Sequence, residues 1–211
     1  MGTFKIVTQR PDGVTFDMAG TTYELEMESL SPIGAQIIET DASTEEEFIL
    51  SAHDADAIIA RGRQITKNII DHLGHCKIIA LGSVGADSVD VEAATKQNIP
   101  VTNVPDVFIE EVADHTMMLI LATFRRLNTM ELFVKTGRWS EGRPLLSRYP
   151  RLMGQTLGFI SFGHVARATA IRAKPFGLHM LAYDPYIEEL TTTQYGVEPV
   201  GLTELLQRSD I

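Results

Sequence analysis

A glycine-containing turn between two apolar runs carries the clearest chemical signal in this sequence. Ser161, Gly163 and Ala166 stand at the spacing of a dinucleotide-binding turn, G-x-G-x-x-G/A, with serine in the first place. The start of a following helix offers unpaired N–H groups and a partial positive charge, which together bind a pyrophosphate. A side chain at position 163 would collide with that phosphate, so glycine lets the backbone approach it. Ser161 is compatible with the turn if its φ angle is negative, and its hydroxyl then can reach a phosphate or a water.

Asp184 closes the apolar run that follows the predicted helix, about 20 residues beyond the turn. A carboxylate at this place accepts hydrogen bonds from ribose hydroxyls, and it repels a 2′-phosphate, which favours NAD over NADP. A buried βαβ unit without a ligand is the alternative interpretation of the same pattern. A P-loop is disfavoured, because His164 and Val165 stand where that motif needs Lys and Ser/Thr.

Composition narrows the classes of partner. The chain has 211 residues and a formal net charge of −10, which disfavours nonspecific binding to nucleic acid or to anionic membranes. The longest apolar run, residues 117–124, is too short to span a bilayer. A single cysteine, Cys76, and an N-terminus without a secretory signal predict a cytoplasmic protein. No residue is assigned to a metal.

Strands alternate with helices along the chain, which predicts an α/β fold with doubly wound parallel sheets. The predicted strands are residues 4–7, 36–38, 57–60, 77–81, 101–102, 157–160, 178–183 and 197–200. The predicted helices are residues 23–30, 44–52, 66–73, 91–96, 110–127, 165–173 and 202–207. Residues 9–21 are predicted to form a loop, residues 133–149 to be less regular, and residues 209–211 to enter a further strand.

Ligands of such sheets bind beyond the carboxyl ends of the strands, and Gly82-Ser83-Val84-Gly85 lies at one of these ends. Two glycines that flank two residues can present backbone N–H groups as an anion-binding nest. A tight turn between strand and loop is the alternative interpretation.

Several sequence blocks together resemble one family. They are KIIA (77–80), GSVGAD (82–87), VDVEAA (89–94), IPVTNVP (99–105), EEVADHT (110–116), GQTLG (154–158) and YDP (183–185). In this order, they resemble the D-isomer-specific 2-hydroxyacid dehydrogenases, a family that includes phosphoglycerate dehydrogenase, hydroxypyruvate reductases and the C-terminal-binding-protein corepressors. The resemblance covers nearly the whole chain.

The resemblance implies a flavodoxin-like substrate domain over residues 1–103 and a Rossmann NAD-binding domain over residues 104–211, the second incomplete. It implies that the backbone of Ser83, Val84 and Gly85 holds a substrate carboxylate. The cofactor residues that it implies are Thr116 near the nicotinamide, His164 and Val165 at the pyrophosphate, and Asp184 at the ribose, with Ser161 and Gly163 in the turn. It also implies a homodimer formed through the long helix and residues 133–149.

The sequence departs from the family pattern at the catalytic residues and at three other positions. The family's catalytic Arg, Glu and His find no match in these 211 residues, so no residue is assigned a catalytic role, and a truncated, inactive member is expected. Ser161 replaces the family's first glycine, Ser88 stands where Asn is common, and Val84 argues against phosphite as substrate.

The expected activity is hydride transfer between NAD(H) and a small 2-hydroxy or 2-oxo acid. A corepressor-like protein that senses NAD(H) without turnover is the alternative. A third hypothesis is a pair of flavodoxin-like domains that bind no nucleotide, with the turn occluded at Ser161. Stabilisation of the chain by NADH would distinguish the first two hypotheses, which predict cofactor binding, from this third one.

Overall fold

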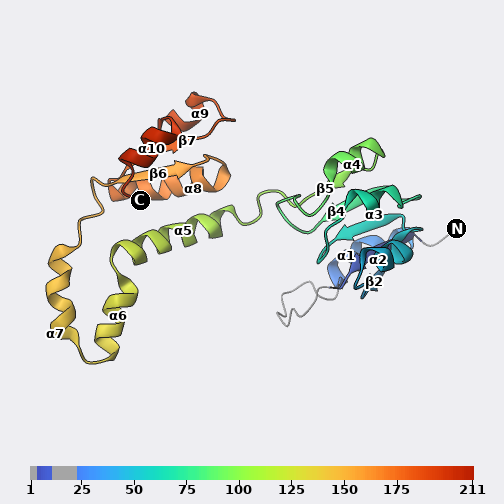
Figure 1. Cartoon of the computed structure of the whole chain (residues 1–211), viewed down its shortest axis with the longest axis horizontal. Coiled ribbons are helices and arrows are strands. Elements are labelled where there is room, and N and C mark those ends of the chain that lie inside the picture. Colours follow the sequence, from blue (N-terminus) through green and yellow to red (C-terminus); the bar gives the residue numbers. More distant parts are fainter. Residues whose placement is uncertain (1–3, 11–22) are drawn as a thin grey trace. The chain divides into compact units, whose positions relative to one another are not determined.

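The computed structural model describes residues 4–10 and 23–211. The chain folds into two compact units, Met1–Val107 and Phe108–Ile211 (Figure 1). The loop predicted within residues 9–21 falls largely outside the described residues, and Gln9 itself belongs to a strand. No helix in the described part of the chain is long and apolar enough to cross a membrane.

A parallel sheet of five strands forms the centre of the first unit. The elements, in chain order, are β1 (Phe4–Gln9), α1 (Glu24–Leu30), η1 (Ser31–Ile33), β2 (Ala35–Thr40), α2 (Glu45–Ala52), β3 (Ala57–Ala60), α3 (Lys67–Asp71), β4 (Ile78–Leu81), α4 (Val91–Lys96) and β5 (Val101–Thr102). The strand order is β2-β1-β3-β4-β5, and every pairing is parallel. This is the order of flavodoxin-like doubly wound sheets, whose ligands bind where the strand order reverses, here between β1 and β3.

Aliphatic side chains from the strands and from the helices beside them fill the core of the first unit. Local signals in the sequence determine where its helices begin. Val7, Ile58 and Ile79 are fully buried on adjacent strands. Helix α2 begins with a reciprocal cap: the Thr44 side chain accepts the N–H of Glu47 at 3.2 Å, and the Glu47 carboxylate accepts the N–H of Thr44 at 3.3 Å. Such a capping box satisfies two N–H groups that the helix itself leaves unpaired.

The second unit contains a three-stranded parallel sheet, in the order β6-β7-β8. Its elements are α5 (Ile109–Phe124), α6 (Leu127–Lys135), α7 (Trp139–Gly142), η2 (Arg143–Arg148), β6 (Thr156–Ile160), α8 (His164–Ala173), η3 (Lys174–Phe176), β7 (His179–Tyr183), α9 (Glu189–Thr193), β8 (Glu198–Pro199) and α10 (Leu202–Arg208). The last residues also run beside β6, because the Gly158 N–H donates to the Ile211 carbonyl at 2.9 Å and the Ile211 N–H to the Thr156 carbonyl at 3.1 Å.

Helix α5 packs beside α8 in this unit (Figure 1). The Arg172 guanidinium on α8 joins the two helices, bonding Glu110 at 2.5 Å and Asp114 at 2.6 Å. These two ion pairs fix α8 against its neighbour.

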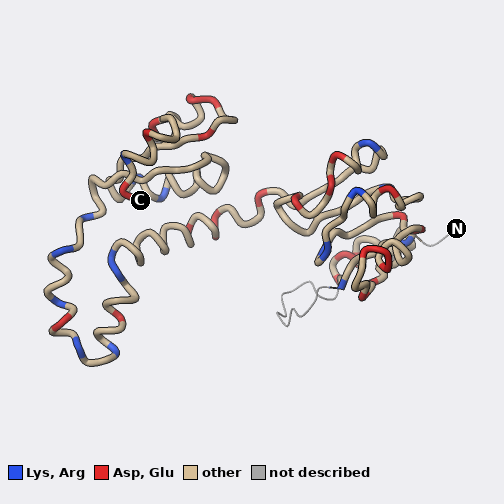
Figure 2. The backbone as a smooth tube through the Cα atoms, viewed as in Figure 1, with Lys and Arg blue, Asp and Glu red and all other residues tan. Residues whose placement is uncertain are grey.

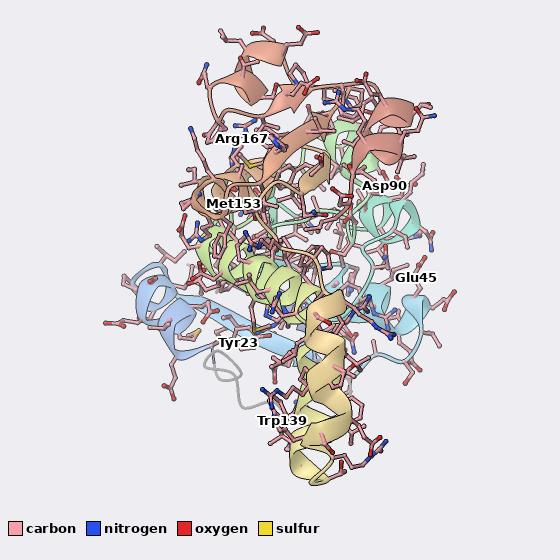
Figure 3. All side chains as sticks on the ribbon, turned by 90° about the vertical axis from the view of Figure 1, so that its left-hand side faces the viewer. Tyr23, Glu45, Asp90, Trp139, Met153 and Arg167 are labelled. Carbon is pink, nitrogen blue, oxygen red and sulfur yellow. The ribbon has the colours of Figure 1, made fainter. Side chains whose placement is uncertain are left out.

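The structure corrects two predictions about the segment after α5. The single helix predicted over residues 110–127 ends at Phe124, because Arg126 adopts a left-handed conformation with φ 54°, and α6 then begins at Leu127. Residues 133–149 were predicted to be less regular, but α6, α7 and η2 make most of them helical. Helix α6 is amphipathic, but none of its side chains is buried. We call the segment formed by α6, α7 and η2 the helical arm, and Trp139 lies on it (Figure 3).

Candidate cofactor site

The turn between β6 and α8 leaves the start of α8 open. Gly163 is the N-cap residue of α8, and no side chain in the described part of the chain caps this end. A Cβ placed on Gly163 would meet no protein atom within 4 Å, so the space in front of the helix is free. The N–H groups of the first turn and the helix dipole therefore face an accessible space that suits an anion.

Aromatic packing holds the turn between β6 and α8 against the core of the second unit. Phe162 is fully buried and makes edge-on contacts with Phe159 and Tyr195, with ring centroids 5.6 and 5.7 Å apart. Arg167, one turn into α8, donates from Nε to the Phe162 carbonyl at 3.0 Å. The backbone of residues 161–163 is thus held rigidly before any ligand arrives, which reduces the ordering cost of binding.

The condition set for Ser161 in this turn, a negative φ angle, is not met, because its φ is 75°. The first position of the turn needs a left-handed backbone to lead β6 into α8, and glycine is the residue that adopts it without strain. Serine adopts it here, and its hydroxyl donates to the Asp184 carboxylate at 3.2 Å.

Asp184 lies directly after β7 and is bonded to the turn itself. Its Oδ2 atom accepts the Phe162 N–H at 2.8 Å and the Ser161 hydroxyl at 3.2 Å, and its Oδ1 atom accepts the Tyr186 N–H at 2.9 Å. The two backbone N–H groups, Phe162 first, hold the pKa of this carboxyl below its usual range, with smaller help from the Ser161 hydroxyl and the nearby Arg167. Oδ1 accepts one donor in this set and keeps capacity for another, such as a ribose hydroxyl.

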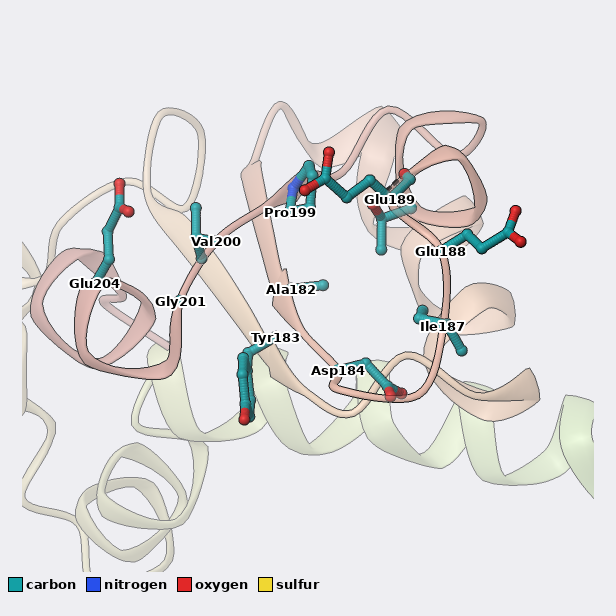
Figure 4. A pocket seen from close by; sticks show the side chains of 11 residues that line it. Ala182, Tyr183, Asp184, Ile187, Glu188, Glu189, Pro199, Val200, Gly201 and Glu204 are labelled. Carbon is teal, nitrogen blue, oxygen red and sulfur yellow. Dashed lines mark hydrogen bonds between the residues drawn. The ribbon is translucent and has the colours of Figure 1, made fainter.

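A pocket of about 380 Å³ opens beside Asp184 at the carboxyl ends of β7 and β8 (Figure 4). Ala182 and Ile187 contribute apolar surface to it, and Glu188, Glu189 and Glu204 add carboxylates around it. Acidic residues gather at this α9–α10 end of the unit (Figure 2). The lining suits an uncharged ring and a sugar, whereas a further phosphate group would meet strong repulsion.

The other cofactor residues named from the sequence lie on the same unit. His164 is the exposed first residue of α8, and Val165, next to it, is half-buried. Thr116 lies in the middle of α5, half-buried, with its hydroxyl bonded to the Val112 carbonyl at 2.8 Å. The structure therefore bonds Ser161 and Phe162 to Asp184, and Gly163, His164 and Val165 follow directly in the chain.

Hydrogen bonds to its carbonyl groups hold the loop after β4 in the first unit. The Asn103 amide donates to the Val84 carbonyl at 2.7 Å, the Ser83 hydroxyl to the Gly85 carbonyl at 2.8 Å, and the Val104 N–H to the Ser83 carbonyl at 3.1 Å. With three consecutive carbonyls engaged, Ser83, Val84 and Gly85 form an exposed loop of fixed conformation.

Sequence reasoning missed the arginines at the same edge of the first sheet. Arg61 directly follows β3, whose last residue pairs with Leu81 of β4, so Arg61 adjoins the strand end that leads into the Ser83 loop. Arg63 has a structural role, bonding the Gln9 side chain at 3.1 Å and the Ala42 carbonyl at 2.5 Å. An arginine immediately after a buried strand was the available signal.

Comparison with known proteins gives a consistent result. Residues 19–206 match the model of the family "D-isomer specific 2-hydroxyacid dehydrogenase, catalytic domain". D-3-phosphoglycerate dehydrogenase of Methanocaldococcus jannaschii is 37% identical over 169 residues, covering 79% of this chain and 32% of that protein. Glyoxylate reductase of Thermococcus onnurineus is 34% identical over 170 residues, covering 78% of this chain and 51% of that protein.

Among solved structures, D-lactate dehydrogenase from Aquifex aeolicus, complexed with NAD and lactic acid, superposes with a TM-score of 0.78 at 25% identity. That match covers 97% of this chain and 58% of the other. The chain thus spans about a third to a half of the length of the two curated relatives named above. The family match over most of the chain, together with parallel sheets and a glycine turn bonded to an acidic strand end, shows that this chain belongs to the D-isomer-specific 2-hydroxyacid dehydrogenase family.

Proposed function

We propose that this chain binds NAD(H) and belongs to an oxidoreductase that transfers hydride between NAD(H) and a small 2-hydroxy or 2-oxo acid. The observation that carries the proposal is the open start of α8 at Gly163, bonded through Phe162 to the carboxylate of Asp184. The described relatives, a phosphoglycerate dehydrogenase and a glyoxylate reductase by name, support the class of substrate. Residues 104–211 are proposed as the NAD-binding part and residues 1–103 as the substrate-binding part.

The residues of the turn have separate roles in this proposal. The N–H groups that begin α8 at His164 and Val165 bind the pyrophosphate, and Oδ1 of Asp184 accepts a ribose hydroxyl. The acid-lined pocket receives the adenosine and disfavours a 2′-phosphate, so NAD is preferred to NADP. Thr116 is proposed to lie near the nicotinamide, which supplies the hydride chemistry when the cofactor is bound.

In the first unit, the backbone of Ser83, Val84 and Gly85 is proposed to hold the substrate carboxylate. Arg61 adds positive charge at the same strand ends, which would raise the local concentration of an anionic substrate. None of the 211 residues matches the family's catalytic Arg, Glu or His, so we propose that this polypeptide alone binds cofactor without turnover.

The helical arm is proposed to mediate homodimerisation. Leu127, Leu132, Val134 and Trp139 are all exposed on α6 and α7, and α6 buries none of its side chains. Apolar side chains concentrated on an element without its own core favour a protein partner. The cytoplasmic location expected from the single Cys76 stays a prediction.

NADH titration tests the proposal directly. Binding at 100-fold excess over Kd should stabilise the native chain by about 2.7 kcal/mol, seen as a raised unfolding temperature. Gly163→Ala places a Cβ in the open space before α8, where it meets nothing within 4 Å, and should abolish this stabilisation while the unfolding temperature of the unliganded chain falls only slightly through the weaker N-cap.

Gly74→Ala is the matched control, since a Cβ there also meets nothing within 4 Å and the residue belongs to the other unit. It should bind NADH like the parent chain. A parent chain that gains no stability from NADH would refute the proposal.

A further inference from the structure

Ser161 combines a strained backbone with a specific side-chain contact. Its φ of 75° lies in the left-handed region, where serine is disfavoured and glycine is not. Gly163, two residues on, has φ −73° and adopts an ordinary extended conformation. A residue kept in a disfavoured conformation at a ligand-binding turn suggests that its side chain has a use there.

The side chain completes the bonding of one carboxylate oxygen. Oδ2 of Asp184 has two lone pairs, and it accepts the Phe162 N–H at 2.8 Å and the Ser161 hydroxyl at 3.2 Å. Oδ1 accepts the Tyr186 N–H at 2.9 Å and has a second lone pair to offer. With both oxygens engaged, the carboxylate cannot rotate without breaking hydrogen bonds, and an incoming hydroxyl is directed to Oδ1.

We propose that Ser161 is a positioning residue for the cofactor: its hydroxyl fixes the Asp184 carboxylate so that Oδ1 faces the ribose, at the expense of backbone strain in the free protein. This inference rests on the proposed function and goes beyond it. It states that Ser161, which stands where the family has glycine, strengthens the binding of NADH. The backbone strain and the hydroxyl can therefore be measured separately, the first as stability and the second as cofactor affinity.

Two substitutions separate the strain from the hydroxyl. Ser161→Gly removes both, so its unfolding midpoint should lie above that of Ser161→Ala, which keeps the strain, while its Kd for NADH should be roughly fivefold that of the parent because the carboxylate is no longer held. Ser161→Ala removes the hydroxyl and keeps a Cβ at the same φ. It should weaken NADH binding by a similar factor with no gain in stability.

A double-mutant cycle with Asp184→Asn tests whether Ser161 acts through Asp184. In the Asp184→Asn background, Ser161→Ala should change the Kd for NADH less than twofold, because the group that the hydroxyl positions is gone. The ¹³Cγ resonance of Asp184 supplies a readout without cofactor: in Ser161→Ala it should titrate at a higher pH than in the parent, since a donor to the carboxylate is lost.

Equal NADH affinity in the parent, Ser161→Gly and Ser161→Ala would overturn the inference. Equal losses of affinity on Ser161→Ala in the parent and in the Asp184→Asn background would overturn it as well. Failure of the proposed function looks different. A parent chain that does not bind NADH refutes the cofactor assignment, while an unchanged Asp184 titration in Ser161→Ala would separately refute the contact between Ser161 and Asp184.

Discussion

Gly158 in the middle of β6 is expected to be the glycine of the second unit that is least tolerant of a side chain. A Cβ built there would lie 2.1 Å from Ser209 Oγ, 3.0 Å from Ser209 Cβ and 3.1 Å from Leu205 Cδ2. Leu205 is the buried residue of α10, and the Ser209 hydroxyl donates to the Leu205 carbonyl at 2.7 Å. Gly158→Ala must therefore displace the end of α10 or turn the serine side chain away from its acceptor.

The expected cost follows from these contacts. Forcing a methyl group into a packed core costs about 1–3 kcal/mol, and losing the serine hydrogen bond adds about 1 kcal/mol, so the sum is about 2–4 kcal/mol. With a urea m-value of about 2 kcal/mol per M, the unfolding midpoint of the second unit should fall by about 1–2 M. Circular dichroism during urea titration measures this, with the first unit's transition as an internal reference.

Ser209→Ala combined with Gly158→Ala removes the closest clash and should recover part of the loss. Gly163→Ala serves as the control, because a Cβ there meets nothing within 4 Å and only the N-cap preference for glycine is lost, so the midpoint should fall by no more than about 0.5 M. A Gly158→Ala chain that unfolds at the parent's urea concentration, or a double variant no more stable than the single one, would refute the packing of α10 on β6 described above.

Three further predictions concern a cap, a titration and an interface. Thr44→Ala removes the capping box of α2 and should cost about 1 kcal/mol, measured as a lower urea midpoint of the first unit. The native pKa of Asp184 is depressed, so its contribution to stability is complete above the ordinary value of about 3.9 and is lost as the pH falls through the native value. Stability curves of the parent and Asp184→Asn, measured by calorimetry, should therefore run in parallel between pH 7 and 5 and converge below about pH 4. Leu132→Asp, on the exposed face of α6, should convert the proposed homodimer into a monomer, as measured by light scattering at equal protein concentration.

Each of these has an outcome that contradicts it. Glu47→Ala should lower the urea midpoint of the first unit as Thr44→Ala does, because the two side chains form one reciprocal cap. Unchanged midpoints in both variants would contradict the capping box. Parent and Asp184→Asn curves that diverge between pH 7 and 5 would place the titration of Asp184 above its ordinary range. Asn128→Asp adds the same charge at another exposed position of α6 and should leave the dimer intact; dissociation by both variants would indicate repulsion rather than an apolar contact.

The alternation of strands and helices could be predicted from the sequence because each strand is a short apolar run between turn residues. The turn at Gly163 could be located for the same reason. The left-handed conformation of Ser161 could not, since serine disfavours it and the residue type gives no direct sign of the backbone angle. The hydrogen bond from Ser161 to Asp184, 23 residues away in sequence, could not be predicted either, because it depends on the pairing of β6 with β7.

The arm and the first sheet's arginines were missed for other reasons. The single helix predicted over residues 110–127 is wrong because the left-handed Arg126 separates two helices. Helix α6 is amphipathic, so its periodicity was available in the sequence, although none of its side chains is buried. Arg61 was overlooked because its position gains meaning only when β3 and β4 are known to be neighbours.

The acidic residues around the pocket proposed to receive adenosine have a kinetic consequence. Glu188, Glu189 and Glu204 surround a pocket on a chain whose net charge is −10, and NADH is itself an anion. Long-range repulsion slows the encounter and is screened by salt over about 8–10 Å, whereas the short contacts to fixed N–H groups that hold the bound cofactor are screened much less. The association rate constant should consequently increase with ionic strength while the dissociation rate constant changes little, the reverse of the salt dependence found for electrostatically steered ligands.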